Sequence, residues 1–149
     1  MTYGFLLWGH AADVETIFIL QKRAIRAIYN LKCRESLRDK FNEINIHTFP
    51  SQYIYENIMY VYKNSDKFTK REHTHNVNTR NKRRLQFPRT RLSKVSYSFL
   101  GKGILFFNKI PEALLSLPFN KFKKCIKDNL YKKAYYKVND YLVDINAWD

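Results

Sequence analysis

The chain has 149 residues, of which 45% are hydrophobic and 27% are charged. This balance excludes an intrinsically disordered chain and fits a single globular domain over residues 1–149. Lysine and arginine (27) outnumber aspartate and glutamate (13), and the resulting net charge of +14 favours an anionic partner. Nucleic acid is the leading candidate, although a negatively charged membrane surface would satisfy the same charge.

Cysteine usage and the start of the chain bear on its compartment. Cys33 and Cys125 are the two cysteines, and their wide separation argues against a disulfide framework. The apolar start lacks the basic leader of a signal peptide, and no uncharged run is long enough to span a bilayer. We therefore expect an intracellular protein, in the nucleus or the cytoplasm, with no membrane partner.

Apolar periodicity predicts a helix near the start of the chain. It is expected to run from Asp13, its cap, to about Leu31, with one buried stripe. The stripe steps by three and four residues: Ile17, Leu20, Ala24, Ile28 and Leu31. The far side carries Lys22, Arg23 and Arg26, either as a solvated basic face or as a second surface for phosphates.

A second long helix is expected after a short helical turn at Ser36–Phe41. Thr48, with Pro50 just beyond it, is typical of a helix start, and the periodicity continues to about Lys63. The tyrosines of this helix are predicted to lie in the core rather than to form a ligand platform: Tyr53, Tyr55 and Tyr60.

From 64 to 95 the periodicity disappears, which predicts a long basic loop or extended arm between the central helices and the C-terminal helix. No acidic residue lies between Glu72 and Glu112. The basic residues of this segment are Arg80, Lys82, Arg83, Arg84, Arg89, Arg91 and Lys94. They indicate either a solvated charged loop or a phosphate-contacting segment, with Phe87 and Tyr97 available to stack on bases.

An apolar anchor follows this basic segment directly. Its core-type residues are Phe99, Ile104, Leu105, Phe106, Phe107 and Ile110. Residues 97–110 could form a helix, although Gly101 and Gly103 disfavour one. Two glycines so close together point more strongly to a backbone that approaches something tightly. Lys102, between the two glycines, is a further candidate for contacting phosphate.

The C-terminal part is predicted to hold a short helix at Pro111–Leu117 and a last long helix that Asn120 caps and that ends near Tyr136. The buried stripe of the long helix is Phe122, Ile126, Leu130 and Ala134. Lysines cover its other faces, and the acidic tail at 137–149 is expected to be frayed. The fold class is therefore mainly α, a small helical domain.

Residue patterns that signal catalysis or cofactors are missing. His73 and His75 stand two apart without a cysteine pair or a carboxylate cluster, and His10 and His47 stand alone, so no metal site is expected. The chain has no glycine-rich nucleotide loop and no paired aspartates of the two-metal kind. We expect no enzymatic activity from this chain by itself and no cofactor.

Four blocks of sequence, in order, resemble a known family. They are YGFLLWG at Tyr3–Gly9, LQKRAIRAIYN at Leu20–Asn30, the basic segment with its anchor at Thr79–Pro111, and FNKFKKCIKDNLYKKAYYKVNDYL at Phe119–Leu142. This pattern is similar to the C-terminal region of reverse transcriptases from non-long-terminal-repeat retrotransposons, the jockey-like mobile elements. The resemblance covers nearly the whole chain.

The resemblance implies a fragment that lies downstream of a missing polymerase palm and thumb. It would bind RNA or DNA for the upstream reverse transcriptase domain, with no catalytic centre of its own. The nucleic-acid-binding residues would be Arg80, Lys82, Arg83, Arg84, Phe87, Arg89, Arg91, Lys94 and Lys102. Two alternatives stay open: an interaction module whose apolar anchor docks on the polymerase thumb, and an inert transposon relic.

Overall fold

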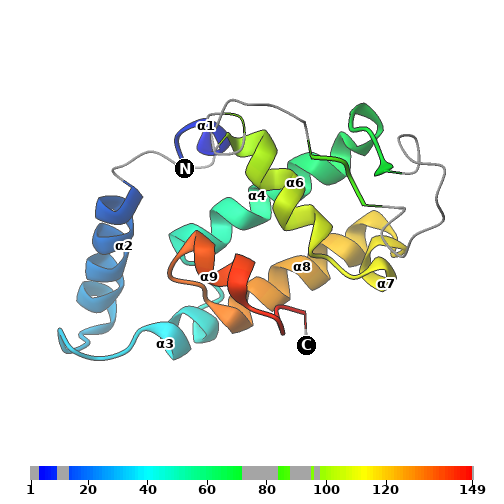
Figure 1. The fold of residues 1–149 in the computed structure, drawn as a ribbon. Helices are drawn as coiled ribbons and strands as arrows, with labels where there is room; N and C mark the ends of the chain where they lie inside the picture. The colour runs from blue at the N-terminus through cyan, green and yellow to red at the C-terminus, as the bar shows by residue number, and fades with distance from the viewer. Residues whose placement is uncertain (1–3, 10–13, 72–83, 88–94, 96–97, 149) are drawn as a thin grey trace.

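The computed structural model describes residues 4–9, 14–71, 84–87, 95 and 98–148, and over these residues the chain is mainly helical, as predicted (Figure 1). In chain order the elements are α1 (Phe5–Trp8), α2 (Val14–Tyr29), α3 (Arg38–Glu43), α4 (Phe49–Lys63), the 3₁₀ turn η1 (Ser65–Lys67), α6 (Phe99–Asn108), α7 (Glu112–Leu115), α8 (Phe119–Lys133) and α9 (Val138–Val143). Most of the predicted basic arm, and the expected cap Asp13, lie outside the described residues.

The central element is α4, which is buried on nearly every side. It begins as predicted: the Thr48 hydroxyl accepts a hydrogen bond from the Ser51 amide, and a proline stands in the first turn. Tyr53 is fully buried and Tyr55 nearly so, which confirms the core role predicted for the tyrosines at these two positions. Helices α1, α2, α6, α8 and α9 all contact α4, so it forms the axis of the domain.

Helix α6 packs along α4 over the most extensive helix–helix contact of the described residues. Gly101 and Gly103 are both buried in α6. A Cβ atom on Gly103 would lie 2.9 Å from Cγ2 of Val61 in α4, closer than ordinary van der Waals contact. The sequence left a helix here open, and the structure shows one at Phe99–Asn108. The predicted close approach is present as well, because the missing side chain lets α6 lie directly against α4.

Helix α8 lies beside α4 and buries the predicted stripe of Phe122, Ile126 and Leu130. Its expected cap is wrong: the helix begins at Phe119 with Pro118 at the N-cap, so Asn120 lies inside the first turn. The fixed φ of proline suits this entry into a helix, and no side chain caps it.

The expectation of a frayed tail is also wrong for the described residues up to 148. The tail forms α9, whose Tyr141 is fully buried and donates a hydrogen bond to the carbonyl oxygen of Phe106. The Tyr135 hydroxyl donates to Asp144 over 2.7 Å, and this bond lowers the pKa of that carboxyl. Long-range contacts, which local composition does not reveal, thus order the tail.

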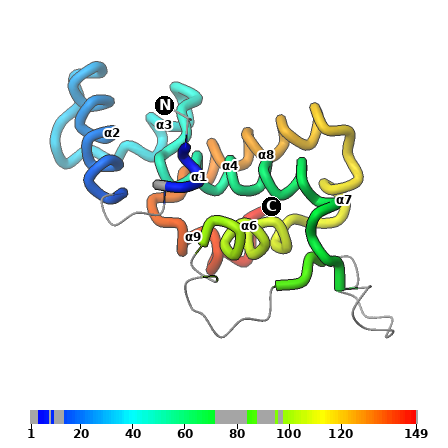
Figure 2. Tube along the Cα trace, turned by 90° about the horizontal axis from the view of Figure 1, so that it is seen from above, coloured from blue at the N-terminus to red at the C-terminus, as the bar shows by residue number. Residues whose placement is uncertain are grey.

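Helix α2 stands at one end of the molecule in both views (Figures 1 and 2). Its predicted buried stripe is wrong at Leu20, Ala24 and Ile28, which are exposed, Leu20 by 55% and Ile28 by 73%. The other two predicted residues, Ile17 and Leu31, are partly buried against the core, and the buried residues of the helix are Phe18 and Ile25. The ring of Phe18 lies against those of Phe41 and Tyr136, with centroids 6.3 and 5.1 Å away. This aromatic cluster decides which face of α2 turns inward and leaves the predicted stripe largely in solvent.

No helix among the described residues is both long enough and apolar enough to cross a bilayer.

Replacing Gly103 with valine tests the contact between α4 and α6. The new side chain has no room beside Val61, so we expect the free energy of unfolding to fall by about 3 kcal/mol in urea denaturation. The matched control is Leu105→Val in the same helix, where the side chain is 42% exposed and the change should cost under about 1 kcal/mol. Equal losses in the two variants would contradict close packing at Gly103.

Candidate nucleic-acid interface

Three of the nine residues predicted to bind nucleic acid lie in the described part of the chain: Arg84, Phe87 and Lys102. The other six lie outside the described residues: Arg80, Lys82, Arg83, Arg89, Arg91 and Lys94. What the structure does show is how the ends of the basic segment attach to the helices.

A short antiparallel bridge joins the two sides of the gap at 72–83. Lys70 pairs with Leu85, the Arg71 amide donates to the Arg84 carbonyl oxygen over 3.0 Å, and the Gln86 amide donates to the Thr69 carbonyl oxygen over 2.8 Å. The described residues that flank 72–83 therefore lie side by side. They include three exposed cations, Lys70, Arg71 and Arg84.

The Asn108 carboxamide fastens this bridge to the helical frame. Its Oδ1 accepts from the Leu85 amide over 2.8 Å, and its Nδ2 donates to the Leu85 carbonyl oxygen over 2.9 Å. The Leu85 side chain is 2% exposed, so its backbone and its side chain are both held. Asn108 ends α6, and the seating of α6 on α4 therefore sets the position of residues 84–87. The sequence did not predict this role, because no local pattern shows which backbone groups an asparagine side chain will bind.

Of the three described candidates, Arg84 is the most accessible to a phosphate. It is exposed, and none of the described acidic side chains forms an ion pair with it. Phe87 is half-buried and packs against the core, so only part of its ring faces outward. Lys102 is also half-buried, and burial lowers the pKa of its ammonium group.

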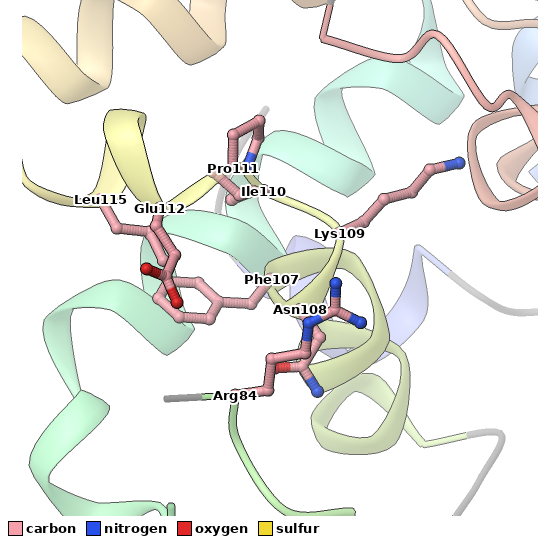
Figure 3. A pocket seen from close by; sticks show the side chains of 8 residues that line it. All are labelled: Arg84, Phe107, Asn108, Lys109, Ile110, Pro111, Glu112 and Leu115. Atoms are coloured by element: carbon pink, nitrogen blue, oxygen red, sulfur yellow. The ribbon is translucent and has the colours of Figure 1, made fainter. Parts of the chain in front are cut away.

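A pocket of about 360 Å³ opens beside Arg84 (Figure 3). Its lining residues are Arg84, Phe107, Asn108, Lys109, Ile110, Pro111, Glu112 and Leu115. The Lys109 side chain extends away from the others, and its ammonium group donates to the carbonyl oxygens of Tyr141 and Leu142. Arg84 is therefore the cation available at this pocket.

The solvent face of α8 supplies a second positive surface, which we call the α8 lysine face. Its exposed cations are Lys121, Lys123, Lys124, Lys127 and Lys132. Asp128 is the single acid within the helix. The sequence alone shows that these lysines are present. They form one outward surface because the opposite face of α8 is buried, as the structure shows.

His47 holds α8 against the start of α4. Its imidazole is 6% exposed, with Nδ1 2.8 Å from Oε1 of Gln52 and Nε2 3.2 Å from the Lys127 carbonyl oxygen. The Tyr131 ring lies over it, with centroids 4.0 Å apart. Burial lowers the pKa of His47, while the two hydrogen bonds oppose that shift. This histidine is a structural link between two helices.

No group of three or more histidine, cysteine, aspartate or glutamate side chains converges as a metal site within the described residues. No family model, curated protein or solved structure matches the chain.

The buried imidazole predicts a pH dependence of stability. Because the pKa of His47 is lowered from 6.5 in the folded state, the unfolded chain takes up the proton first as the pH falls. We expect the free energy of unfolding to be highest above pH 6.5 and to decrease as the pH falls towards about 5.5, and His47→Gln to flatten this curve. Urea denaturation at several pH values measures the effect.

The control is the triple variant that replaces His10, His73 and His75 with glutamine and keeps His47. It should retain the pH dependence of the wild type. A His47→Gln variant that keeps the full dependence would show that another group is responsible.

Proposed function

We propose that this chain binds nucleic acid through its basic segment, with the α8 lysine face as a supporting surface. The observation that carries the proposal is the attachment of the segment: Leu85 is buried and held at both backbone atoms by Asn108, while Arg84 beside it is exposed. A cationic stretch fastened to a rigid frame pays less ordering entropy on binding than a free tail does.

The charge balance supports the same proposal. Between Glu72 and Glu112 the sequence has no acid to neutralise the basic residues. Among the described side chains, ion pairs join Lys40 with Glu43 and Lys133 with Asp144. The lysines of the α8 lysine face take no part in these pairs and are exposed. Binding of phosphates to such cations releases counterions, and it weakens steeply as added salt makes that release less favourable.

The resemblance of the four sequence blocks gives this binding a context. We infer a C-terminal accessory domain of a retrotransposon-derived reverse transcriptase, which would hold RNA or DNA for a catalytic region encoded upstream. Two features of the resemblance support this inference: the order of the four blocks and their coverage of nearly the whole chain. The proposal assigns no catalytic step to this chain.

The test is a titration of a labelled oligonucleotide at several salt concentrations. With about six to eight phosphate contacts, the slope of log K against log[salt] should be roughly −4 to −7. Replacing Arg83, Arg84, Arg89 and Arg91 with glutamine should weaken binding at least about tenfold and make the slope shallower by roughly 3 to 4, with no loss of helical circular dichroism.

The matched control removes the same charge elsewhere, through Arg23, Lys32, Arg34 and Lys67, each exposed and each replaced by glutamine. Its affinity should stay within about threefold of the wild type. Equal losses in the two variants would show attraction by net charge alone and would refute a localised interface.

A second candidate function, protein docking, is favoured by the exposed face of α2. Leu20 and Ile28 are exposed there on either side of the small Ala24. The segment 14–36 carries five cations and two acids. An apolar and basic surface of this kind would bind an amphipathic helix with acidic flanks. In this candidate the thumb of the upstream polymerase would supply that partner helix. In this candidate the contact surface is α2 rather than the apolar anchor, because α6 is already packed on α4.

If α2 is a docking surface, the isolated chain should self-associate, because the apolar residues Leu20 and Ile28 are exposed to water. Replacing Leu20 and Ile28 with serine should restore a monomer in size-exclusion chromatography with light scattering. The control variant Val143→Ser with Ile145→Ser removes exposed apolar side chains elsewhere and should behave as the wild type does. A wild-type chain that is monomeric alone, and that does not co-purify with a co-expressed palm and thumb, would reject this candidate.

A further inference from the structure

The pocket beside Arg84 is placed at the root of the basic segment. Arg84 enters it from beside the bridge of Lys70 with Leu85, and the other lining residues come from the end of α6, the turn that follows it and α7 (Figure 3). A polymer with a phosphate bound to Arg84 would therefore lie at the mouth of this pocket.

The walls of the pocket combine apolar and polar surface. Phe107, Ile110, Pro111 and Leu115 contribute hydrocarbon surface, and Arg84 adds the planar guanidinium group. Glu112 adds carboxylate oxygens near Phe107 and Leu115, and a carboxylate has room for several donors besides any bond that it already makes. A ligand that fits these walls has a flat apolar face, carries amino groups that can donate to the carboxylate, and is attached to a negatively charged group that Arg84 can contact.

We propose that the pocket receives one unpaired base of the bound nucleic acid, while Arg84 contacts the adjoining phosphate. This inference rests on the proposed nucleic-acid binding and narrows it to single-stranded polymer or to an unpaired end. Recognition of single strands by pockets and platforms of this composition is common, because any base offers a π-face and amino or carbonyl edges.

The size of the pocket agrees with one base. Its volume of about 360 Å³ lies near the lower end of the range of small-molecule sites, roughly 300 to 1,000 Å³. A base that enters it has to leave its own stack, so a paired base meets a cost that an unpaired base does not. The pocket should therefore discriminate against duplex and against a strand that has phosphates but no bases.

The experiment compares three labelled probes of about twelve nucleotides at one salt concentration: a single strand, a duplex and an abasic strand with the same phosphates. The wild-type chain should bind the single strand about tenfold more tightly than the abasic strand. Leu115→Trp fills the pocket and should reduce this ratio to about twofold or less. Ala113→Trp places the same side chain on an exposed position of α7 outside the pocket and should keep the ratio.

The outcomes separate this inference from the proposed function. Salt-dependent binding of all three probes with equal affinity by the wild type overturns the base pocket and leaves electrostatic binding standing. No salt-dependent binding of any probe overturns both. A folded Leu115→Trp variant that keeps the tenfold ratio also overturns the pocket. The wild-type comparison is decisive even if that variant does not fold.

Discussion

The approach of α6 to α4 at Gly103 is the contact on which the rest of the arrangement depends. With 2.9 Å between a notional Cβ and Cγ2 of Val61, a side chain at this position would force Val61 or one of the two helices to shift. Because α6 is seated there, its last residue, Asn108, reaches the backbone of Leu85. The core thus determines where Leu85 and its described neighbours in the basic segment lie.

This arrangement separates the apolar and cationic parts of the chain cleanly. The interior of the described part is aliphatic and aromatic, with Tyr53, Phe106 and Tyr141 stacked edge to face through the centre. The cations remain outside, at the bridge and on the α8 lysine face. A desolvated cation would be costly, as the lowered pKa values of the half-buried Lys102 and Lys109 illustrate. The fold therefore presents its excess charge to solvent and to anionic partners.

Local signals in the sequence predicted much of this fold. Thr48 with Pro50 marked the start of α4, and the glycines of α6 indicated a close approach that the structure contains. The prediction of which α2 residues face the core was wrong in part. Apolar residues lie on more than one side of that helix, and the aromatic partners Phe41 and Tyr136 come from distant parts of the chain. The role of Asn108 could not be predicted because its partner is also distant in the sequence: 23 residues separate it from the backbone that it binds.

The most direct measurement of the central claim is amide hydrogen exchange at Leu85. The attachment by Asn108 predicts a protected Leu85 amide in the wild type and exchange at least about tenfold faster in Asn108→Ala, with the amides of α4 unchanged. Asn64→Ala, which removes a carboxamide that bonds only within its own helix end and the adjoining turn, should leave Leu85 protected. A Leu85 amide that exchanges freely in the wild type, or equally in both variants, would show that the basic segment is not fastened to α6.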